Sequence, residues 1–204
     1  FSYSSGDVSL GDMSSLQTIG SSAFYNLCGV LTIDTAASKL KSIGSRAFAT
    51  SSNSYGSASS SIKLSNLSSL TTAGTSSAGL SFEGFKGSVS LGGLVQAPQY
   101  ILRDYEGAGA TLHDMRQLTS IGYMAFYNAV IVKGTSIGDM PLLKTISPYA
   151  FYECTGALHL GDMASLTTIG DEAFQYFSGD VSLGDMPSLQ TIGSSAFYNL
   201  CGVL

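Results

Sequence analysis

The segment Val181–Phe197 has the sequence VSLGDMPSLQTIGSSAF, and copies of it occur along the whole chain. Val8–Phe24 has VSLGDMSSLQTIGSSAF, and Leu158–Phe174 has LHLGDMASLTTIGDEAF. Weaker copies are Leu31–Phe48, Ile62–Ala78, Val89–Tyr105, Ala110–Phe126 and Thr135–Phe151. One phrase that recurs at a regular spacing is typical of repeat proteins, in which each unit buries its apolar face against the next unit.

The spacing of the copies gives a basic period of 23 residues. Leu10 marks one position of the repeat, and its equivalents are Ile33, Leu64, Leu91, Leu112, Ile137, Leu160 and Leu183. The longer steps between them locate three insertions, at Ser51–Ser60, Ser81–Gly87 and Ala129–Gly134. The sequence therefore predicts eight stacked coils.

Apolar residues within each unit first alternate and then lose that period. Val8 and Leu10 flank Ser9, which indicates a strand with one buried side. The predicted fold class is mainly β, a solenoid with few or no long helices. The phenylalanines that share one phase should form a buried column: Phe24, Phe48, Phe126, Phe151, Phe174 and Phe197, with Ala78 and Tyr105 in the same position of two irregular coils.

The composition excludes several classes of protein. Of the 204 residues, 44% are apolar and 11% are charged, against about 25% charged residues in an average domain. Intrinsic disorder is therefore disfavoured. The net charge of −5 disfavours binding to nucleic acid, which selects basic surfaces. No apolar run approaches the roughly 20 residues of a membrane-spanning helix, so this segment is expected not to span a membrane.

The phrase L-x-x-I-G-x-x-A-F resembles the repeat of the BspA-like class of leucine-rich repeats. It is complete in Leu16–Phe24, Leu40–Phe48, Leu118–Phe126, Leu166–Phe174 and Leu189–Phe197, and Leu143–Phe151 departs from it only at Ser147. The resemblance implies a β-rich solenoid, display on a cell surface, and a role in adhesion or recognition. It implies no conserved chemistry.

A longer period is superimposed on the short one. Residues 1–31 and 174–204 are identical at 28 of 31 positions, which gives a recurrence of 173 residues, or seven coils. We interpret residues 1–204 as a single solenoid and as a window of a longer tandem array. In the alternative, the chain is a subunit whose two ends meet copies of itself.

No set of residues in the sequence forms a known catalytic motif. The three cysteines, Cys28, Cys154 and Cys201, have about the same inward phase, which favours small buried thiols over intermolecular disulfides. His113 and His159 have different phases, and no His–Cys spacing suits zinc. The chain is therefore expected not to be an enzyme and to need no cofactor.

Aspartates recur at one phase, directly after the first strand of the unit. They are Asp12, Asp114, Asp139, Asp162 and Asp185. Stacked carboxylates repel one another, so either each accepts hydrogen bonds from local backbone N–H groups or cations lie between them. The first alternative is favoured, and the second would be a cation row along Asp114, Asp139, Asp162 and Asp185.

Another phase of the repeat is occupied by small polar residues. A hydroxyl ladder is expected along Thr18, Ser42, Thr72, Ser120, Thr145, Thr168 and Thr191. Such a face can be simply solvated, can pack against another protein or filament, or can contact glycans or ice. The sequence Asn66-Leu67-Ser68 is a formal N-glycosylation site.

The sequence supports two hypotheses about function. The first is an extracellular or surface protein, structural or adhesive, that assembles with itself into filaments or arrays. The second is a recognition module that binds a host or cell-surface protein or a glycan on its concave sheet, with the contact at Tyr100, Arg103, Tyr105 and Glu106 in the irregular coils. A surface that is the same on every coil favours the first hypothesis, and an aromatic patch confined to a few coils favours the second.

Overall fold

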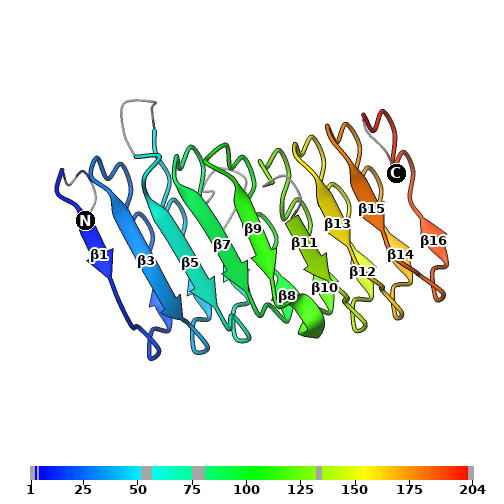
Figure 1. The fold of residues 1–204 in the computed structure, drawn as a ribbon, viewed down its shortest axis with the longest axis horizontal. Helices are drawn as coiled ribbons and strands as arrows, with labels where there is room; N and C mark the ends of the chain where they lie inside the picture. Colours follow the sequence, from blue (N-terminus) through cyan, green and yellow to red (C-terminus); the bar gives the residue numbers. More distant parts are fainter. Residues whose placement is uncertain (1–2, 4, 52–56, 75–80, 132–134, 202–204) are drawn as a thin grey trace.

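A computed structural model describes the whole chain except residues 1–2, 4, 52–56, 75–80, 132–134 and 202–204. The chain winds into a solenoid in which a longer strand and a two-residue strand alternate (Figure 1). Among the described residues there are eight such pairs, so about seven full turns separate the first long strand from the last. We number the coils one to eight from β1. No helix in the described part of the chain could cross a membrane.

The long strands lie side by side along the long axis of the molecule (Figure 1). They are β1 (Val8–Leu10), β3 (Leu31–Ala36), β5 (Ser61–Ser65), β7 (Ser88–Gly92), β9 (Ala110–His113), β11 (Thr135–Gly138), β13 (Leu158–Leu160) and β15 (Val181–Leu183). All their pairings are parallel, in the orders β1-β3-β5-β7-β9 and β11-β13-β15.

The short strands form a second series of parallel pairs. They are β2 (Thr18–Ile19), β4 (Ser42–Ile43), β6 (Thr72–Ala73), β8 (Gln96–Ala97), β10 (Ser120–Ile121), β12 (Thr145–Ile146), β14 (Thr168–Ile169) and β16 (Thr191–Ile192). A 3₁₀ helix, η1 (Met115–Gln117), lies between β9 and β10. The mainly β solenoid predicted from the sequence is thus confirmed.

The register of the long strands departs from the predicted one at coil three. Leu10 pairs with Ile33 as expected, but Ile33 pairs with Ile62, and Leu64 pairs with Thr35. The reason lies in β3, which is six residues long and alternates between buried and exposed positions. Its third inward position, Thr35, is buried and accepts a hydrogen bond from the Met13 N–H at 2.8 Å.

A stacked column of phenylalanines fills the core. Phe24, Phe48, Phe126, Phe151 and Phe174 are buried, and Phe197 is half-buried. The centroids of stacked neighbouring rings are 4.8 to 5.3 Å apart. The column predicted from the common phase is confirmed in the regular coils.

The irregular coils fill the phenylalanine position differently from the prediction. In a regular pair of coils, the Phe24 N–H donates to the carbonyl of Ala47, the residue before the next phenylalanine. The equivalent hydrogen bonds in the irregular coils run from the Phe48 N–H to the Ser81 carbonyl and from the Leu102 N–H to the Ala125 carbonyl. Phe82 and Leu102 therefore occupy the position assigned to Ala78 and Tyr105; Ala78 itself lies outside the described residues. The insertion of coil three accordingly precedes Phe82 and does not span Ser81–Gly87.

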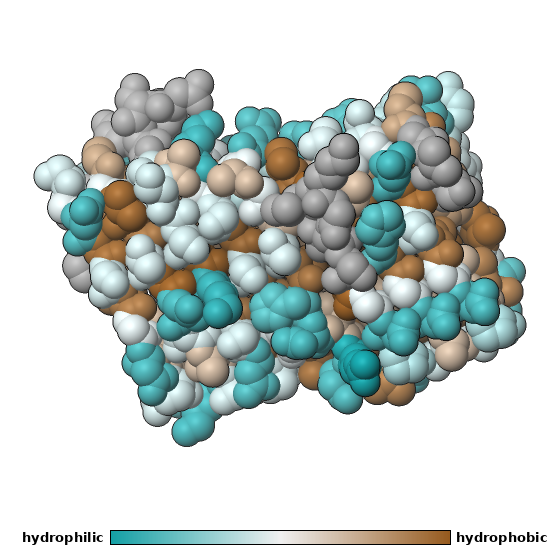
Figure 2. Space-filling model, viewed as in Figure 1, coloured by the Kyte–Doolittle hydropathy of each residue, from teal (hydrophilic) through white to brown (hydrophobic). Residues whose placement is uncertain are grey.

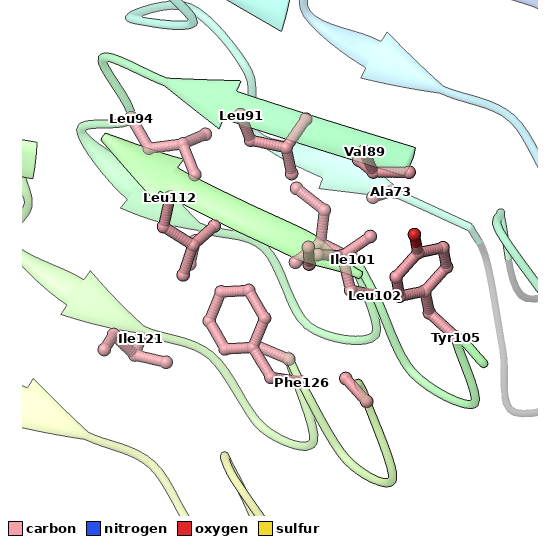
Figure 3. Packing of buried hydrophobic residues seen from close by; sticks show 14 of the residues in the cluster. Ala73, Val89, Leu91, Leu94, Ile101, Leu102, Tyr105, Leu112, Ile121 and Phe126 are labelled. Carbon is pink, nitrogen blue, oxygen red and sulfur yellow. The ribbon is translucent and has the colours of Figure 1, made fainter. Parts of the chain in front are cut away.

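Tyr105 lies three residues beyond that position, in a second inward column. It is fully buried, and its ring lies inward beside Ile101, Leu102 and Val89 (Figure 3). Cys154 and Phe177 have the same place in coils six and seven, where both are buried.

The surface seen from the side of the long strands is mostly polar or weakly polar, with apolar residues showing between the coils (Figure 2).

Candidate functional site

The aspartates that follow the long strands accept hydrogen bonds from backbone N–H groups. Asp139 Oδ1 accepts from the Asp162 N–H at 3.1 Å, and Asp162 Oδ1 accepts from the Asp185 N–H at 2.9 Å. The donor therefore belongs to the next coil, whereas the sequence predicted a donor in the same turn. Asp12 does bond within its own turn, to the Ser14 N–H at 2.9 Å. Asp114 instead contacts Nδ1 of its neighbour His113 at 2.9 Å.

The glycines before Asp162 and Asp185 make room for the carboxylate of the previous coil. A Cβ atom on Gly161 would lie 2.5 Å from Asp139 Oδ1, and one on Gly184 would lie 2.6 Å from Asp162 Oδ1. Both distances are shorter than real Cβ atoms tolerate. The Gly–Asp dipeptide thus contacts both neighbouring coils. Its glycine leaves space for the carboxylate of the previous coil, and its aspartate accepts a hydrogen bond from a backbone N–H of the next coil. We call this arrangement the Gly–Asp contact.

The same contact recurs at a second corner of the coil. Asp171 Oδ1 accepts from the Ser194 N–H at 2.7 Å, and a Cβ on Gly193 would lie 2.5 Å from that oxygen. At a third corner, Asp7 Oδ1 accepts from the Val30 N–H at 2.8 Å. In the part of the chain that the structure describes, no group of three His, Cys, Asp or Glu side chains could hold a metal ion. The cation row stays a prediction.

The four residues proposed as a binding patch do not form one surface. Tyr105 is buried, and its hydroxyl lies 2.6 Å from the Gly87 carbonyl and accepts the Gly109 N–H at 3.1 Å. Burial raises the pKa of Tyr105 to about 12. Tyr105 is therefore a core residue. Glu106 is exposed, and Tyr100 and Arg103 are partly exposed.

Tyr100 and Arg103 lie beyond β8, in the segment that leads from a short strand to the next long strand. We call this part of each coil the return segment. The Arg103 guanidinium lies over the rings of Tyr100 and Tyr127, 5.7 and 5.1 Å from their centroids. Its Nε is 3.2 Å from Asp104 Oδ2. The patch is therefore on the return segments and not on a strand, contrary to the expected site on the sheet.

The return segments of coils four to eight carry a continuous array of tyrosines, of which the sequence predicted only Tyr100 as a site residue. Its members are Tyr100, Tyr123, Tyr127, Tyr149, Tyr152, Tyr176 and Tyr198, linked by ring centroids 4.9 to 5.9 Å apart. We call this array the tyrosine strip. The Tyr149 hydroxyl donates to Glu172 Oε1 at 2.9 Å, and this bond raises the pKa of Tyr149. The recurrence of tyrosine within three residues of Phe126, Phe151, Phe174 and Phe197 was the signal available in the sequence.

The remaining candidates are single residues. Cys28 and Cys201 are exposed and only Cys154 is buried, so the prediction of three buried thiols is wrong for two of them. Burial raises the pKa of Cys154 to about 12. Asn66 is exposed and has a left-handed backbone with φ 56°, and its glycosylation stays a prediction. In the hydroxyl ladder, Ser42 Oγ donates to Thr18 Oγ1 at 3.3 Å.

A family model for the BspA type leucine rich repeat region matches this chain in six copies, over residues 2–78 and 111–203. The chain therefore belongs to this family, as its repeat phrase indicated. The fold is that of a repeat scaffold. No curated protein and no solved structure matches the chain.

Proposed function

We propose that this chain is a non-enzymatic structural or adhesive module that is displayed outside the cell or on its surface and assembles with copies of itself. The observation that carries the proposal is the Gly–Asp contact, which recurs with the same donors and acceptors between coils six and seven and between coils seven and eight. A further coil with the same phrase, from a tandem array or from another subunit, can be added by the same bonds.

The long period supports continuation of the stack. Residues 1–31 and 174–204 are nearly identical, and β1 and β15 have the same pattern of buried and exposed residues. A coil of one copy is therefore an acceptable neighbour for a coil of another. Pairing of this kind covers the backbone groups that an open sheet edge exposes.

Electron microscopy of the purified chain tests this proposal. We expect filaments or ordered arrays, with an axial repeat of roughly 34 Å from seven coils spaced about 4.8 Å apart. Labelling of unpermeabilised source cells with an antibody against the chain tests its display on the surface. Discrete monomers at all concentrations would contradict assembly, and labelling only after permeabilisation would contradict display.

A recognition module is the second candidate. The tyrosine strip and the position of Arg103 between two rings favour it, because tyrosine and arginine are enriched where binding energy is concentrated. Such a module would bind a protein or a glycan at one place, whereas an assembling module uses every coil. The two functions are compatible, because the Gly–Asp contact and the tyrosine strip involve different residues.

A further inference from the structure

A polar hollow of about 300 Å³ lies on the return segments of coils two to five, at the N-terminal end of the tyrosine strip. Its lining consists of Thr50, Ser51, Glu83, Gly84, Lys86, Asp104, Glu106 and Asn128. Five of the eight come from residues 79–110, the stretch that the family model does not match. The hollow is therefore formed mainly by the coils that depart most from the repeat.

Gly84 explains why the surface is hollowed at this place. It lies two residues after Phe82, and the equivalent residues in coils four and five are Asp104 and Asn128, all three with positive φ. Gly84 adds no side chain to this row. A Cβ there would lie 2.7 Å from the Thr50 carbonyl oxygen and 2.9 Å from Thr50 Oγ1, so no other residue fits without displacing the backbone.

Some polar groups of the hollow are held in place. Asp104 is fixed between Arg103 and Asn128, whose Nδ2 donates to Asp104 Oδ1 at 3.1 Å. Thr50 Oγ1 donates to the Gly84 carbonyl at 2.5 Å. Glu83, Lys86 and Glu106 form no ion pair among the described residues. The hollow thus offers fixed groups and charged groups that a ligand could engage.

The mixture of donors and acceptors selects the ligand. The three carboxylates disfavour an anion, and with Lys86 and the neighbouring Arg103 they leave a net charge of about −1, which is too small to select a cation strongly. A sugar hydroxyl both donates and accepts, so it suits hydroxyl, amide, ammonium and carboxylate groups together. The volume is at the lower end of the roughly 300–1,000 Å³ of small-molecule pockets.

An aromatic surface next to the hollow supports the same class of ligand. Tyr127 precedes Asn128 in the chain, and its carbonyl accepts the Asp104 N–H at 2.9 Å. Its ring stacks on Tyr152 at 4.9 Å, and both rings are partly exposed. Arg103 lies over one face of the Tyr127 ring and Tyr152 stacks on the other, so the ring edge and the hydroxyl group are what Tyr127 can offer to a ligand. We propose that this hollow binds a neutral hexose unit of a glycan chain, with the exposed edge of Tyr127 as an adjoining contact.

Affinity electrophoresis in gels that contain a neutral β-glucan, a neutral α-mannan, anionic alginate or cationic chitosan tests this proposal. The double variant Lys86→Ala/Glu106→Ala should weaken binding to a neutral polysaccharide by about tenfold or more, because the sugar loses its hydrogen bonds to two charged groups. Tyr127→Ala should weaken it as well. The charge-matched control is Lys63→Ala/Asp34→Ala, which removes an exposed ion pair on the long strands, and the phase-matched control is Tyr198→Ala in coil eight.

Retarded migration of the wild type in a neutral polysaccharide, lost in the two test variants and kept in the two controls, is the expected result. No retardation by either neutral polysaccharide, retardation only by alginate or chitosan, or equal retardation of all variants would overturn the proposal. Thermal melting of every variant shows whether it is folded. Filament formation, the test of the proposed assembly, is independent, because the hollow contributes nothing to the Gly–Asp contact.

Discussion

Coils six to eight and coils three and four achieve the same packing with different residues. In coils six to eight, each phenylalanine stacks on the next at 5.1 to 5.3 Å, and each Gly–Asp phrase bonds to the next one. In coils three and four, Phe82 and Leu102 fill the phenylalanine position, and Tyr105 occupies the place that Cys154 has in coil six. The outward residues there diverge far more and form the hollow.

The difference shows which constraint is strict. The inward positions must be filled at every coil, because each coil covers the core of its neighbours. The outward positions of the return segments are free to vary, and they form a local site where they differ most, in and beside the irregular coils. Regularity thus suits assembly, and irregularity suits recognition.

Truncation of the phenylalanine column is the largest change expected. Phe151→Ala in the regular coils and Phe82→Ala in the irregular coils should each lower the free energy of unfolding by about 3–5 kcal/mol. Both rings are fully buried, so the costs should be similar. Chemical denaturation measures them. A loss below about 1 kcal/mol for Phe82→Ala alone would show that coil three is not packed like the regular coils.

Tyr105 is the polar member of the irregular core. Tyr105→Phe should cost about 1–3 kcal/mol at pH 8, because the Gly109 N–H and the Gly87 carbonyl lose a buried partner. The free energy of unfolding measured by denaturation provides the value. Phe177→Leu, an apolar change at the same place in coil seven, is the matched control and should show no dependence on alkaline pH.

The same variant has a defined pH dependence. The pKa of Tyr105 is about 12 in the folded chain, against about 10 in an unfolded chain. The folded state therefore holds this proton more tightly, and the wild type loses stability relative to Tyr105→Phe as the pH rises from about 10 toward 12. Denaturation at pH 8, 9, 10 and 11 measures the difference. A constant difference would contradict the buried hydroxyl.

Removal of one Gly–Asp contact should have a smaller effect. Asp162→Ala should cost about 0.5–1.5 kcal/mol, because one hydrogen bond to the next coil is lost at an exposed place. Asp162→Asn keeps an acceptor oxygen and should cost less. Asp114→Ala, which removes a contact to the adjacent His113 only, is the control. Melting with and without EDTA should agree, and a large drop in EDTA would favour the cation row instead.

Thiol labelling should leave the fold unchanged. Iodoacetamide should modify the exposed Cys28 and Cys201 in the native chain and should modify Cys154 only after unfolding. Burial raises the pKa of Cys154 to about 12, so little reactive thiolate forms near neutral pH. Mass spectrometry of the labelled peptides distinguishes the three sites. Modification of native Cys154 would contradict the packing of coil six.

The sequence by itself determined the solenoid, its period and most of its core. The alternation of Val8 and Leu10 and the recurrence of phenylalanine every 23 residues are local patterns, and each predicts a buried position without knowledge of its neighbours. The common phase of Asp139, Asp162 and Asp185 likewise indicated carboxylates that accept hydrogen bonds from backbone N–H groups. These features can be predicted because every regular coil repeats the same sequence pattern.

Only the tertiary structure decided the features that depend on contacts between coils. Thr35 fills an inward place and displaces the register of β3 against β5 by two residues. Phe82, not Ala78, stacks on Phe48, because the insertion of coil three precedes it. The donors to Asp139 and Asp162 come from the next coil, and the hollow exists because Gly84 lies beside Asp104 and Thr50. Residues so distant in sequence meet only once the coils are stacked, and where the spacing is irregular the period no longer indicates which residues will be neighbours.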